Sequence, residues 1–358
     1  MSERKIKTKY YDGYSLLNMK DLEGEKPSIF ISTSNRSAGK TTFYLTECLK
    51  TFKEKHKKFC IIYRRKYELP SAHEIFGDVM SLHPEFAGEM TSTSQARGLF
   101  YEIFLDGDSC GYAVSLNNPD ELKKYSPIFR EVDFLFMDEY QLETGKYLSD
   151  EFAKLKSVLL TIARGNGKQS RNVTLVLAGN NVSILNPYYI HFGIYKRLKK
   201  GTKKMAGYGW VAEFIFNESA SKEIKNNTLF KALSTTEDRY MKYSTEQDCY
   251  LVDSNAFIEK APKGRSKYLF TIVHDNVRIG IREYYDEGII YASNKPDSTC
   301  KTIVTFKASD HNQNTMMLNH YCYLWKNIRE AFQKNFLRFS DVKIKNSLLE
   351  ILGVDLYK

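Results

Sequence analysis

The chain has 358 residues, of which 42% are apolar, and carries a net charge of +10 from 53 basic and 43 acidic side chains. This length and apolar share exclude a disordered chain and a small disulfide-stapled scaffold, and they predict one large or two ordinary folded domains. The basic balance favours a polyanionic partner such as nucleic acid, because positive charge raises encounter rates and non-specific affinity. A soluble protein that happens to be basic is an equally simple interpretation.

The six cysteines lie far apart, with no C-x-x-C pair and no histidine at metal-ligand spacing. This pattern is typical of reduced thiols in a cytosolic chain. The first 14 residues lack the apolar core of a signal peptide. No apolar run approaches the ~20 residues that span a bilayer. We therefore expect a protein that works inside a cell without membrane contact.

The first half of the chain alternates short apolar strands with helical stretches. The expected strands cover residues 28–32, 59–63, 133–137 and 173–178. A helix is expected from about residue 41 to residue 55. Continuous apolar strands separated by helices predict a parallel sheet that is covered on both faces. Two alternating segments, 100–104 and 111–115, predict a hairpin inserted at the edge of this sheet.

The character of the chain changes after Pro187. Residues 219–243 are polar and favour helices in a linker, and strands are expected at 268–273, 277–281, 289–292 and 302–306. Two helices, about 315–336 and 341–352, close the chain. We predict three parts: an α/β domain with a helix-flanked parallel sheet (1–207), a helical linker (208–254), and a smaller α+β domain (255–358).

A candidate phosphate-binding loop lies between the first strand and the first long helix. Its sequence is Ser34-Asn35-Arg36-Ser37-Ala38-Gly39-Lys40-Thr41-Thr42. A Walker A loop occupies this position in P-loop NTPases, where backbone N–H groups and a helix N-terminus attract phosphate oxygens. Lys40 is expected at the β- and γ-phosphates and Thr41 at Mg²⁺. Ser34 stands where the usual first glycine is found, and a coincidental strand–turn–helix is the alternative.

An acid pair, Asp138 and Glu139, ends the apolar strand 133–137 in the manner of a Walker B motif. Asp138 is expected to hold Mg²⁺ through water, and Glu139 to polarise the attacking water as general base. Taken alone, the pair is equally consistent with acids that cap the next helix. Together with the loop before Lys40, it predicts a P-loop ATPase with ATP and Mg²⁺ as cofactors.

Further residues are candidates for sensing and stabilising the transferred phosphate. Asn180 follows the strand 173–178 and is either a γ-phosphate sensor or an ordinary turn residue. Arg164, Lys168 and Arg171 precede that strand, where an arginine from one subunit can stabilise transition-state charge in its neighbour. We favour Arg164 because it ends an apolar helical run. Lys124 is a weaker trans-acting candidate, and a solvated loop charge is the alternative for each.

A run of basic side chains follows the first predicted domain's last strand. Its members are Lys196, Arg197, Lys199, Lys200, Lys203 and Lys204. Lysine and arginine contacts to phosphates provide affinity without reading sequence, so the run is a candidate nucleic-acid surface. A solvated charge run in a flexible loop is the alternative.

Several segments together resemble the DNA-encapsidation (genome packaging) ATPases of small picovirus-like tailed bacteriophages, which are FtsK–HerA/terminase-like P-loop motors. Besides the loop and the acid pair, the similarity rests on residues 63–69, 180–188, 257–260 and 321–339, in the same order along the chain. The resemblance implies a homo-oligomeric ring, a pentamer, that docks on a phage portal and pumps double-stranded DNA into a prohead. Docking through a packaging RNA occurs in this family. The implied location is the host cytoplasm, with transient attachment to the prohead.

The resemblance also assigns roles within the chain. Arg36 matches the arginine inside the family's P-loop, and Arg164 falls where a trans-acting arginine is expected. The loop after Arg164 is longer here, so Lys168 and Arg171 stay as alternatives. For the C-terminal part the resemblance implies an RNase H-like, nuclease-like fold.

The C-terminal acids do not favour nuclease activity. A two-metal nuclease needs converging carboxylates, one of them typically on the first strand, and residues 268–273 contain none. Asp275, Glu283, Asp286 and Asp310 show no convergence in the sequence, so an inactive nuclease-like domain is expected. The alternative functions are a packaging terminase with a working nuclease and a nucleotide-switched nucleic-acid-binding protein, which has less need of Glu139. A small-molecule kinase would need an acceptor pocket and lid for which the sequence gives no sign.

Overall fold

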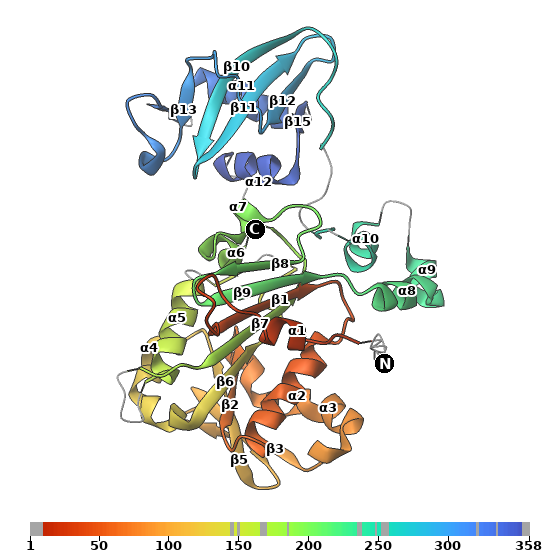
Figure 1. The fold of residues 1–358 in the computed structure, drawn as a ribbon, viewed down its shortest axis with the longest axis vertical. Helices are drawn as coiled ribbons and strands as arrows, with labels where there is room; N and C mark the ends of the chain where they lie inside the picture. Colours follow the sequence, from red (N-terminus) through yellow and green to blue (C-terminus); the bar gives the residue numbers. More distant parts are fainter. Residues whose placement is uncertain are drawn as a thin grey trace. The chain divides into compact units, whose positions relative to one another are not determined.

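The computed structural model describes residues 10–143, 147–148, 151–164, 170–184, 186–234, 238–247, 249–251, 258–319, 322–333 and 336–352, without the side chains of Lys196, Arg239 and Gln333. The chain divides into two compact units, Met1–Leu251 and Val252–Lys358. Each has its own sheet and its own helices (Figure 1). Within the described ranges, no helix combines the length and the apolar character that crossing a membrane requires.

The first unit is built on one large sheet. Its strands are β1 (Ile29–Ser34), β2 (Lys58–Tyr63), β3 (Met90–Gln95), β4 (Phe100–Leu105), β5 (Asp108–Ser115), β6 (Val132–Met137), β7 (Thr174–Asn180), β8 (Lys204–Gly207) and β9 (Trp210–Ile215). They lie in the order β3-β4-β5-β2-β6-β7-β1-β9-β8. The six strands from β5 to β9 in this order run parallel, and β3, β4 and β8 add antiparallel pairs at the two ends.

Helices cover both faces of the parallel strands. The helices of the first unit are α1 (Tyr14–Leu17), α2 (Lys40–Lys53), α3 (Gly77–Leu82), α4 (Pro119–Leu122), α5 (Glu151–Ile162), α6 (Pro187–His191), α7 (Ile194–Arg197), α8 (Glu218–Asn226), α9 (Thr228–Leu233) and α10 (Arg239–Thr245), with 3₁₀ turns η1 (Lys66–Ser71), η2 (Glu74–Phe76), η3 (Pro84–Phe86) and η4 (Lys123–Glu131). α2 and α3 lie on one side, and α4 and α5 on the other (Figure 1). The apolar strands are buried because both faces are covered. The predicted α/β fold is confirmed.

Two features of the first sheet differ from the sequence prediction. The hairpin of β4 and β5 exists, but β5 also pairs in parallel with β2, so it belongs to the body of the sheet and β3 takes the edge. β9 was not anticipated, although it pairs in parallel with β1 next to the phosphate loop. The domain boundary expected after residue 207 falls between β8 and β9, which pair with each other.

Residues 217–246, which we call the helical linker, contain α8, α9 and α10. Each helix begins after a side-chain N-cap, provided by Asn217, Asn227 and Asp238 respectively. The polar helical stretch expected from the sequence is therefore present. It is part of the first unit.

The second unit is smaller and contains both strands and helices. Its elements are β10 (Ser266–His274), β11 (Val277–Tyr284), β12 (Ile289–Ser293), β13 (Ile303–Thr305), η5 (Ala308–Asp310), β14 (Met316–Met317), α11 (Tyr323–Gln333), β15 (Leu337–Phe339) and α12 (Val342–Ile351). The strand order is β14-β13-β10-β11-β12-β15. Trp325 and Ile328 of α11 and Leu348 of α12 bury apolar surface in one core with the strands.

The helix expected over residues 315–336 begins later than predicted. Met316 and Met317 pair in parallel with β13 as a short strand, and the helix starts only at Tyr323. Pairing with a distant strand overrode the local helical pattern in this segment. The final helix was predicted correctly, and Asp341 is its N-cap.

Candidate nucleotide site

The turn between β1 and α2 has the backbone that a phosphate loop needs. β1 ends at Ser34 and α2 begins at Lys40, so the turn is short. Gly39 has φ +96° and Ser37 has φ +57°, both in the left-handed region. Glycine adopts this conformation at little steric cost, which explains its place just before the helix. The turn aims the N-terminus of a 14-residue helix at the cavity described below.

Lys40 is buried at this helix start without an acidic partner. Its side-chain ammonium donates to Ser34 Oγ at 2.6 Å and to Asn180 Oδ1 at 3.2 Å. No carboxylate lies within ion-pair distance of it among the described residues. Burial lowers the pKa of Lys40 to about 8. A buried cation that contacts only neutral groups favours an incoming anion, because the anion would restore the charged form.

Ser34, the departure from the usual glycine, is therefore the residue that holds Lys40. Asn180 also lies where the sequence predicted it. β7 runs between β6 and β1, so its last residue meets the loop from the neighbouring strand end. The backbone is close here, because a Cβ on Gly179 would come within 2.9 Å of the Tyr140 ring.

The acid pair faces the same loop. The Thr41 hydroxyl donates to Asp138 Oδ2 at 2.5 Å, across 97 residues of sequence. A hydroxyl and a carboxylate are oxygen donors of the kind that Mg²⁺ takes beside nucleotide phosphates, so the pair fits the expected ion. Burial raises the pKa of Asp138. Burial and the neighbouring Asp138 raise the pKa of Glu139, which is exposed at the cavity.

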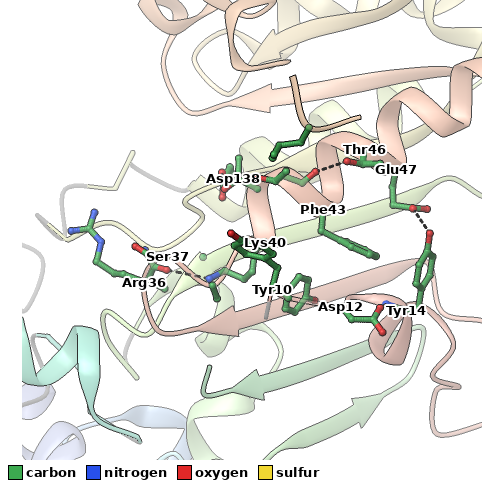
Figure 2. A pocket seen from close by; sticks show the side chains of 18 of the residues that line it. Tyr10, Asp12, Tyr14, Arg36, Ser37, Lys40, Phe43, Thr46, Glu47 and Asp138 are labelled. Atoms are coloured by element: carbon green, nitrogen blue, oxygen red, sulfur yellow. Dashed lines mark hydrogen bonds between the residues drawn. The ribbon is translucent and has the colours of Figure 1, made fainter. Parts of the chain in front are cut away.

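These residues line a cavity of about 950 Å³. Figure 2 shows Lys40 and Asp138 on its wall together with residues of the N-terminal segment and α2. The volume is in the range of small-molecule and cofactor sites. Residues 36–42 of the predicted loop, the acid pair and Asn180 thus line one space large enough for a nucleotide, whereas Ser34 and Asn35 are buried and do not line it.

The N-terminal segment is a part of this site that the sequence did not predict. Tyr10, Tyr11, Asp12 and Tyr14 line the cavity. The Tyr11 backbone N–H donates to the carbonyl of Ala38 in the loop at 2.9 Å. The Tyr14 hydroxyl donates to Glu47 of α2 at 2.8 Å (Figure 2). The density of tyrosines before the first strand was the available signal.

The buried ion pair Arg64–Glu151 holds the backbone that carries the acid pair. Arg64, which directly follows β2, contacts both carboxylate oxygens of Glu151 at 3.1 and 3.0 Å. Its guanidinium also donates to the backbone carbonyls of Glu139 and Tyr140, at 3.2 and 3.0 Å. The Tyr188 hydroxyl donates to Glu151 at 2.7 Å. This network fixes the backbone that carries Glu139, which has a left-handed φ of +49°.

The helical linker is attached directly to the phosphate loop. Asn35 donates to the carbonyl of Asn217 at 3.1 Å and accepts from its N–H at 2.8 Å. Arg36 points away from Lys40 (Figure 2) and lies 3.4 Å from Glu143, with its guanidinium 5.2 Å from the centre of the Tyr240 ring. Any change in the loop on nucleotide binding would therefore reach α8 and α10 through these contacts.

The trans-acting candidates have different surroundings. Arg164 is exposed just after α5, and Lys124 is exposed on η4. Lys168 lies outside the described residues. Arg171 is bound within its own chain, donating to the carbonyls of Phe129 and Ile162 at 2.8 and 2.9 Å. These bonds give Arg171 a structural role and leave Arg164 better placed to reach another subunit.

The basic run lies on α7, on β8 and in the turn between them. Arg197, Lys199, Lys200, Lys203 and Lys204 are exposed, whereas the side chain of Lys196 is not described. Arg197 donates to the carbonyl of Ala206, and Lys204 to that of Ser15. The exposed turn therefore offers Lys199, Lys200 and Lys203 as its most accessible cations.

Comparison with known proteins gives consistent results. Residues 7–354 match the family described as Podovirus DNA encapsidation protein (Gp16). The chain is similar to the DNA packaging proteins of Bacillus phages PZA and phi29, each 24% identical over 320 residues that cover 88% of this chain and 90% of the relative. The DNA packaging protein of Bacillus phage B103 is also 24% identical, over 328 residues.

Solved structures show the same fold. A chain of the bacteriophage Phi-29 viral genome packaging motor assembly has a TM-score of 0.61 and 20% identity, with 97% of this chain and 99% of that chain covered. The Phi-28 gp11 DNA packaging motor has a TM-score of 0.52 and 16% identity, with 98% of both chains covered. Both alignments extend over the two units described above.

The buried pair beneath the acid pair leads to a first prediction. Arg64→Met leaves Glu151 uncompensated in the interior and should lower the free energy of unfolding by about 3–5 kcal/mol. Urea unfolding of the purified chain would measure this change. The double variant Arg64→Met/Glu151→Gln should recover part of the loss, and Arg130→Met, at an exposed arginine on η4, should stay within about 0.5 kcal/mol of wild type. Equal losses at Arg64 and Arg130 would refute a special role for the buried pair.

Proposed function

The chain belongs to the Podovirus DNA encapsidation protein (Gp16) family, and from this premise we propose that it is an ATP-hydrolysing motor that moves double-stranded viral DNA into a preformed prohead. The observation that carries the proposal is the buried Lys40 ammonium, whose hydrogen-bond partners among the described residues are the neutral Ser34 and Asn180, beside the Thr41–Asp138 pair. The DNA packaging role of the relatives supports the substrate.

The residues divide the chemistry among them. The loop amides and Lys40 bind the β- and γ-phosphates, and Asn180 contacts Lys40 from the adjacent strand. Mg²⁺, when bound at Thr41 and Asp138, neutralises phosphate charge. Glu139 orients the attacking water and accepts its proton. Its raised pKa makes it a better base than an ordinary carboxylate.

The hydrolytic role of Glu139 can be separated from nucleotide binding. Glu139→Gln removes the base but keeps the size of the side chain, so ATP turnover should fall by about 10²–10⁴-fold while nucleotide binding persists. Lys40→Ala should lose binding itself. Phosphate release and fluorescent-nucleotide binding, each with and without duplex DNA, would measure both effects. A wild-type chain that binds ATP without turnover would favour the nucleotide-switched binding protein over the motor.

We further propose that the motor is a homo-oligomeric ring in which Arg164 acts on the neighbouring subunit. Its exposed position after α5, and the internal bonds of Arg171, support this choice. In the ring, the guanidinium stabilises charge that develops on the γ-phosphate of the adjacent site. Five subunits on the portal, with a packaging RNA as the docking element, complete the assembly that we propose. The assembly works in the host cytoplasm while attached to the prohead.

Mixing experiments test action between subunits. Arg164→Ala subunits mixed with wild type should lower ATPase activity by more than their share, because each variant subunit also disables a wild-type neighbour. Arg130→Ala is the matched control at another exposed arginine and should lower activity by no more than its share. Activity that stays proportional to the wild-type fraction would count against Arg164 acting in trans.

The exposed turn between α7 and β8 is the proposed grip on DNA. Its cations meet backbone phosphates, which suits a motor that must hold any sequence. Lys199, Lys200 and Lys203 are all exposed, so their ammonium groups are accessible to a bound duplex. The C-terminal unit contributes binding and not cleavage in this proposal. β10 carries no carboxylate, which disfavours a packaging terminase with a working nuclease.

The salt dependence of binding measures this grip. Replacing Lys199, Lys200 and Lys203 with alanine should reduce the slope of log affinity against log salt by up to about 0.9 for each phosphate that is no longer neutralised. Anisotropy titrations with labelled duplex of arbitrary sequence at several salt concentrations give the slope. Alanines at Lys26, Lys55 and Lys57, which are also exposed, form the charge-matched control. If both triple variants behave alike, the DNA surface lies elsewhere.

A further inference from the structure

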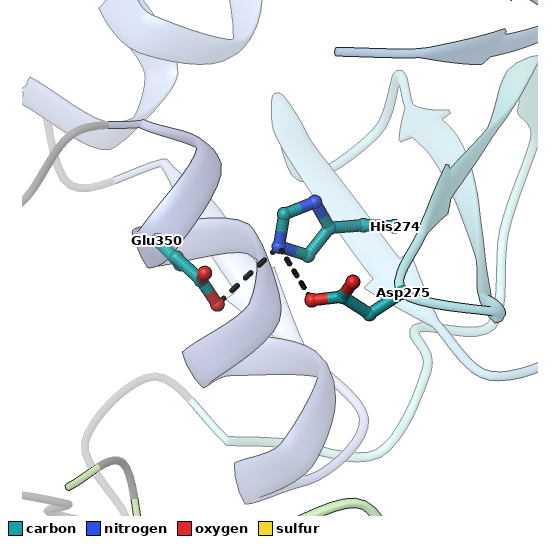
Figure 3. A group of neighbouring side chains, drawn as sticks. All are labelled: His274, Asp275 and Glu350. Atoms are coloured by element: carbon teal, nitrogen blue, oxygen red, sulfur yellow. Dashed lines mark ion pairs between the residues drawn. The ribbon is translucent and has the colours of Figure 1, made fainter. Parts of the chain in front are cut away.

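The second unit brings together acids that the sequence did not show to converge. The Asp275 backbone N–H, in the turn that follows β10, donates to the carboxylate of Asp310 in η5 at 2.7 Å. Glu350 reaches the same place from α12 (Figure 3). Glu350 was not among the acids considered in the sequence, and it is the carboxylate that lies near Asp275, whereas Asp310 binds the Asp275 backbone. Strand pairing of β10 with β13 places these two residues at one end of the sheet.

A buried histidine points into this group. His274, the last residue of β10, is only 5% exposed. Within the described part of the chain, neither of its ring nitrogens has a hydrogen-bond partner in good geometry. Figure 3 shows Nε2 directed between two carboxylates, at 3.3 Å from Glu350 and 3.8 Å from Asp275. A buried imidazole without hydrogen bonds is costly unless something else takes its lone pair.

We propose that His274, Asp275 and Glu350 bind a divalent transition-metal ion such as Mn²⁺ or Zn²⁺. One ligand atom from each residue lies within 4.8 Å of the others. When metal–ligand bonds are about 2.0–2.2 Å long, the ligand atoms around one ion lie roughly 3–4 Å from one another. A small side-chain movement would therefore bring these three ligand atoms to coordinating distance. The imidazole favours a transition metal, because Mg²⁺ and Ca²⁺ take oxygen ligands.

The surroundings suit a single structural ion. Glu350 belongs to α12 and His274 to β10, so an ion between them ties the last helix to the sheet. Asp275 has a left-handed φ of +49°, and its Oδ2 lies 3.8 Å from His274 Nε2. Both carboxylates are partly exposed, with side chains 26% and 41% accessible, which provides a path for the ion.

Lys307 forms an ion pair with Asp275, one of the proposed metal ligands. Its ammonium lies 2.6 Å from Asp275 Oδ2. The side chain is 37% exposed, so it can withdraw into water when an ion arrives. Because the ammonium and the ion compete for the same carboxylate, removing Lys307 should strengthen metal binding. A cluster that is only an ion-pair network has no such response.

The test titrates the full chain with Mn²⁺. Electron paramagnetic resonance measures the free ion, so the bound fraction is obtained by difference. Mn²⁺ avoids the six free cysteines, since thiolates are poor ligands for it. Every protein carries Asp138→Asn, which removes the carboxylate ligand of the nucleotide site and separates this question from the proposed ATPase. We expect one bound Mn²⁺ and a dissociation constant at least roughly 10-fold weaker in Glu350→Gln.

Variants of the cluster and of a residue outside it distinguish metal binding at this site from binding elsewhere. Lys307→Met should tighten binding, His274→Ala should abolish it, and Glu287→Gln, an exposed acid of the same unit, should leave it unchanged. Because replacing a buried residue such as His274 can unfold the domain, circular dichroism accompanies each titration and Glu350→Gln carries the decision. Absence of bound Mn²⁺ in the parent protein overturns the proposal. Binding that Glu350→Gln and Lys307→Met leave unaltered overturns it equally.

Discussion

The arrangement of the first unit depends on the burial of the Lys40 ammonium beside neutral partners. An isolated buried cation is costly, and the bonds to Ser34 and Asn180 offset only part of that cost. The strand order β6-β7-β1 creates this situation, because three neighbouring strand ends deliver the acid pair, Asn180 and the loop to one place. Asp138 is bonded to Thr41 and leaves Lys40 to an anion from outside. The positive charge of Lys40 is therefore left without a counter-ion in the site. A polyphosphate with Mg²⁺ would supply the anion for Lys40 and oxygen ligands beside Thr41 and Asp138.

This same loop is the junction between the site and its surroundings. Asn35 exchanges two hydrogen bonds with Asn217, and Arg36 lies against Glu143 and Tyr240. A loop that tightens on phosphate must carry these contacts with it. On the other side, Arg64 holds the carbonyl of Glu139 within a buried network that is costly to disturb. One wall of the cavity is thus fixed by this network, while the other is joined through Asn217 and Tyr240 to α8 and α10.

Patterns within short segments of the sequence predicted the central strands of the first sheet, the phosphate loop and the acid pair. Apolar runs marked β1, β2, β6 and β7, and the loop and acid pair were found by their place at strand ends. The sequence could not show β9 beside β1, because a six-residue strand after a basic turn has no local sign of its partner. Arg64 and Glu151 are 87 residues apart, and His274 and Glu350 are 76 apart, so only the fold brings them together. The Tyr11 segment was overlooked for the same reason: its partners Ala38 and Glu213 are distant in the chain.

The two units differ in the ions that their donors favour. At the first, the protein offers the oxygens of Thr41 and Asp138, a weak set that phosphate oxygens would complete, so in the proposed ATPase an ion there comes and goes with nucleotide. At the second, an imidazole and two carboxylates from β10, its turn and α12 form a set that needs no substrate. An ion that is exchanged in each cycle suits a catalytic step, and one held by protein ligands alone suits a scaffold. In the proposed motor, this donor chemistry gives turnover to the first unit and rigidity to the second, which is the division of labour that gripping and moving DNA requires.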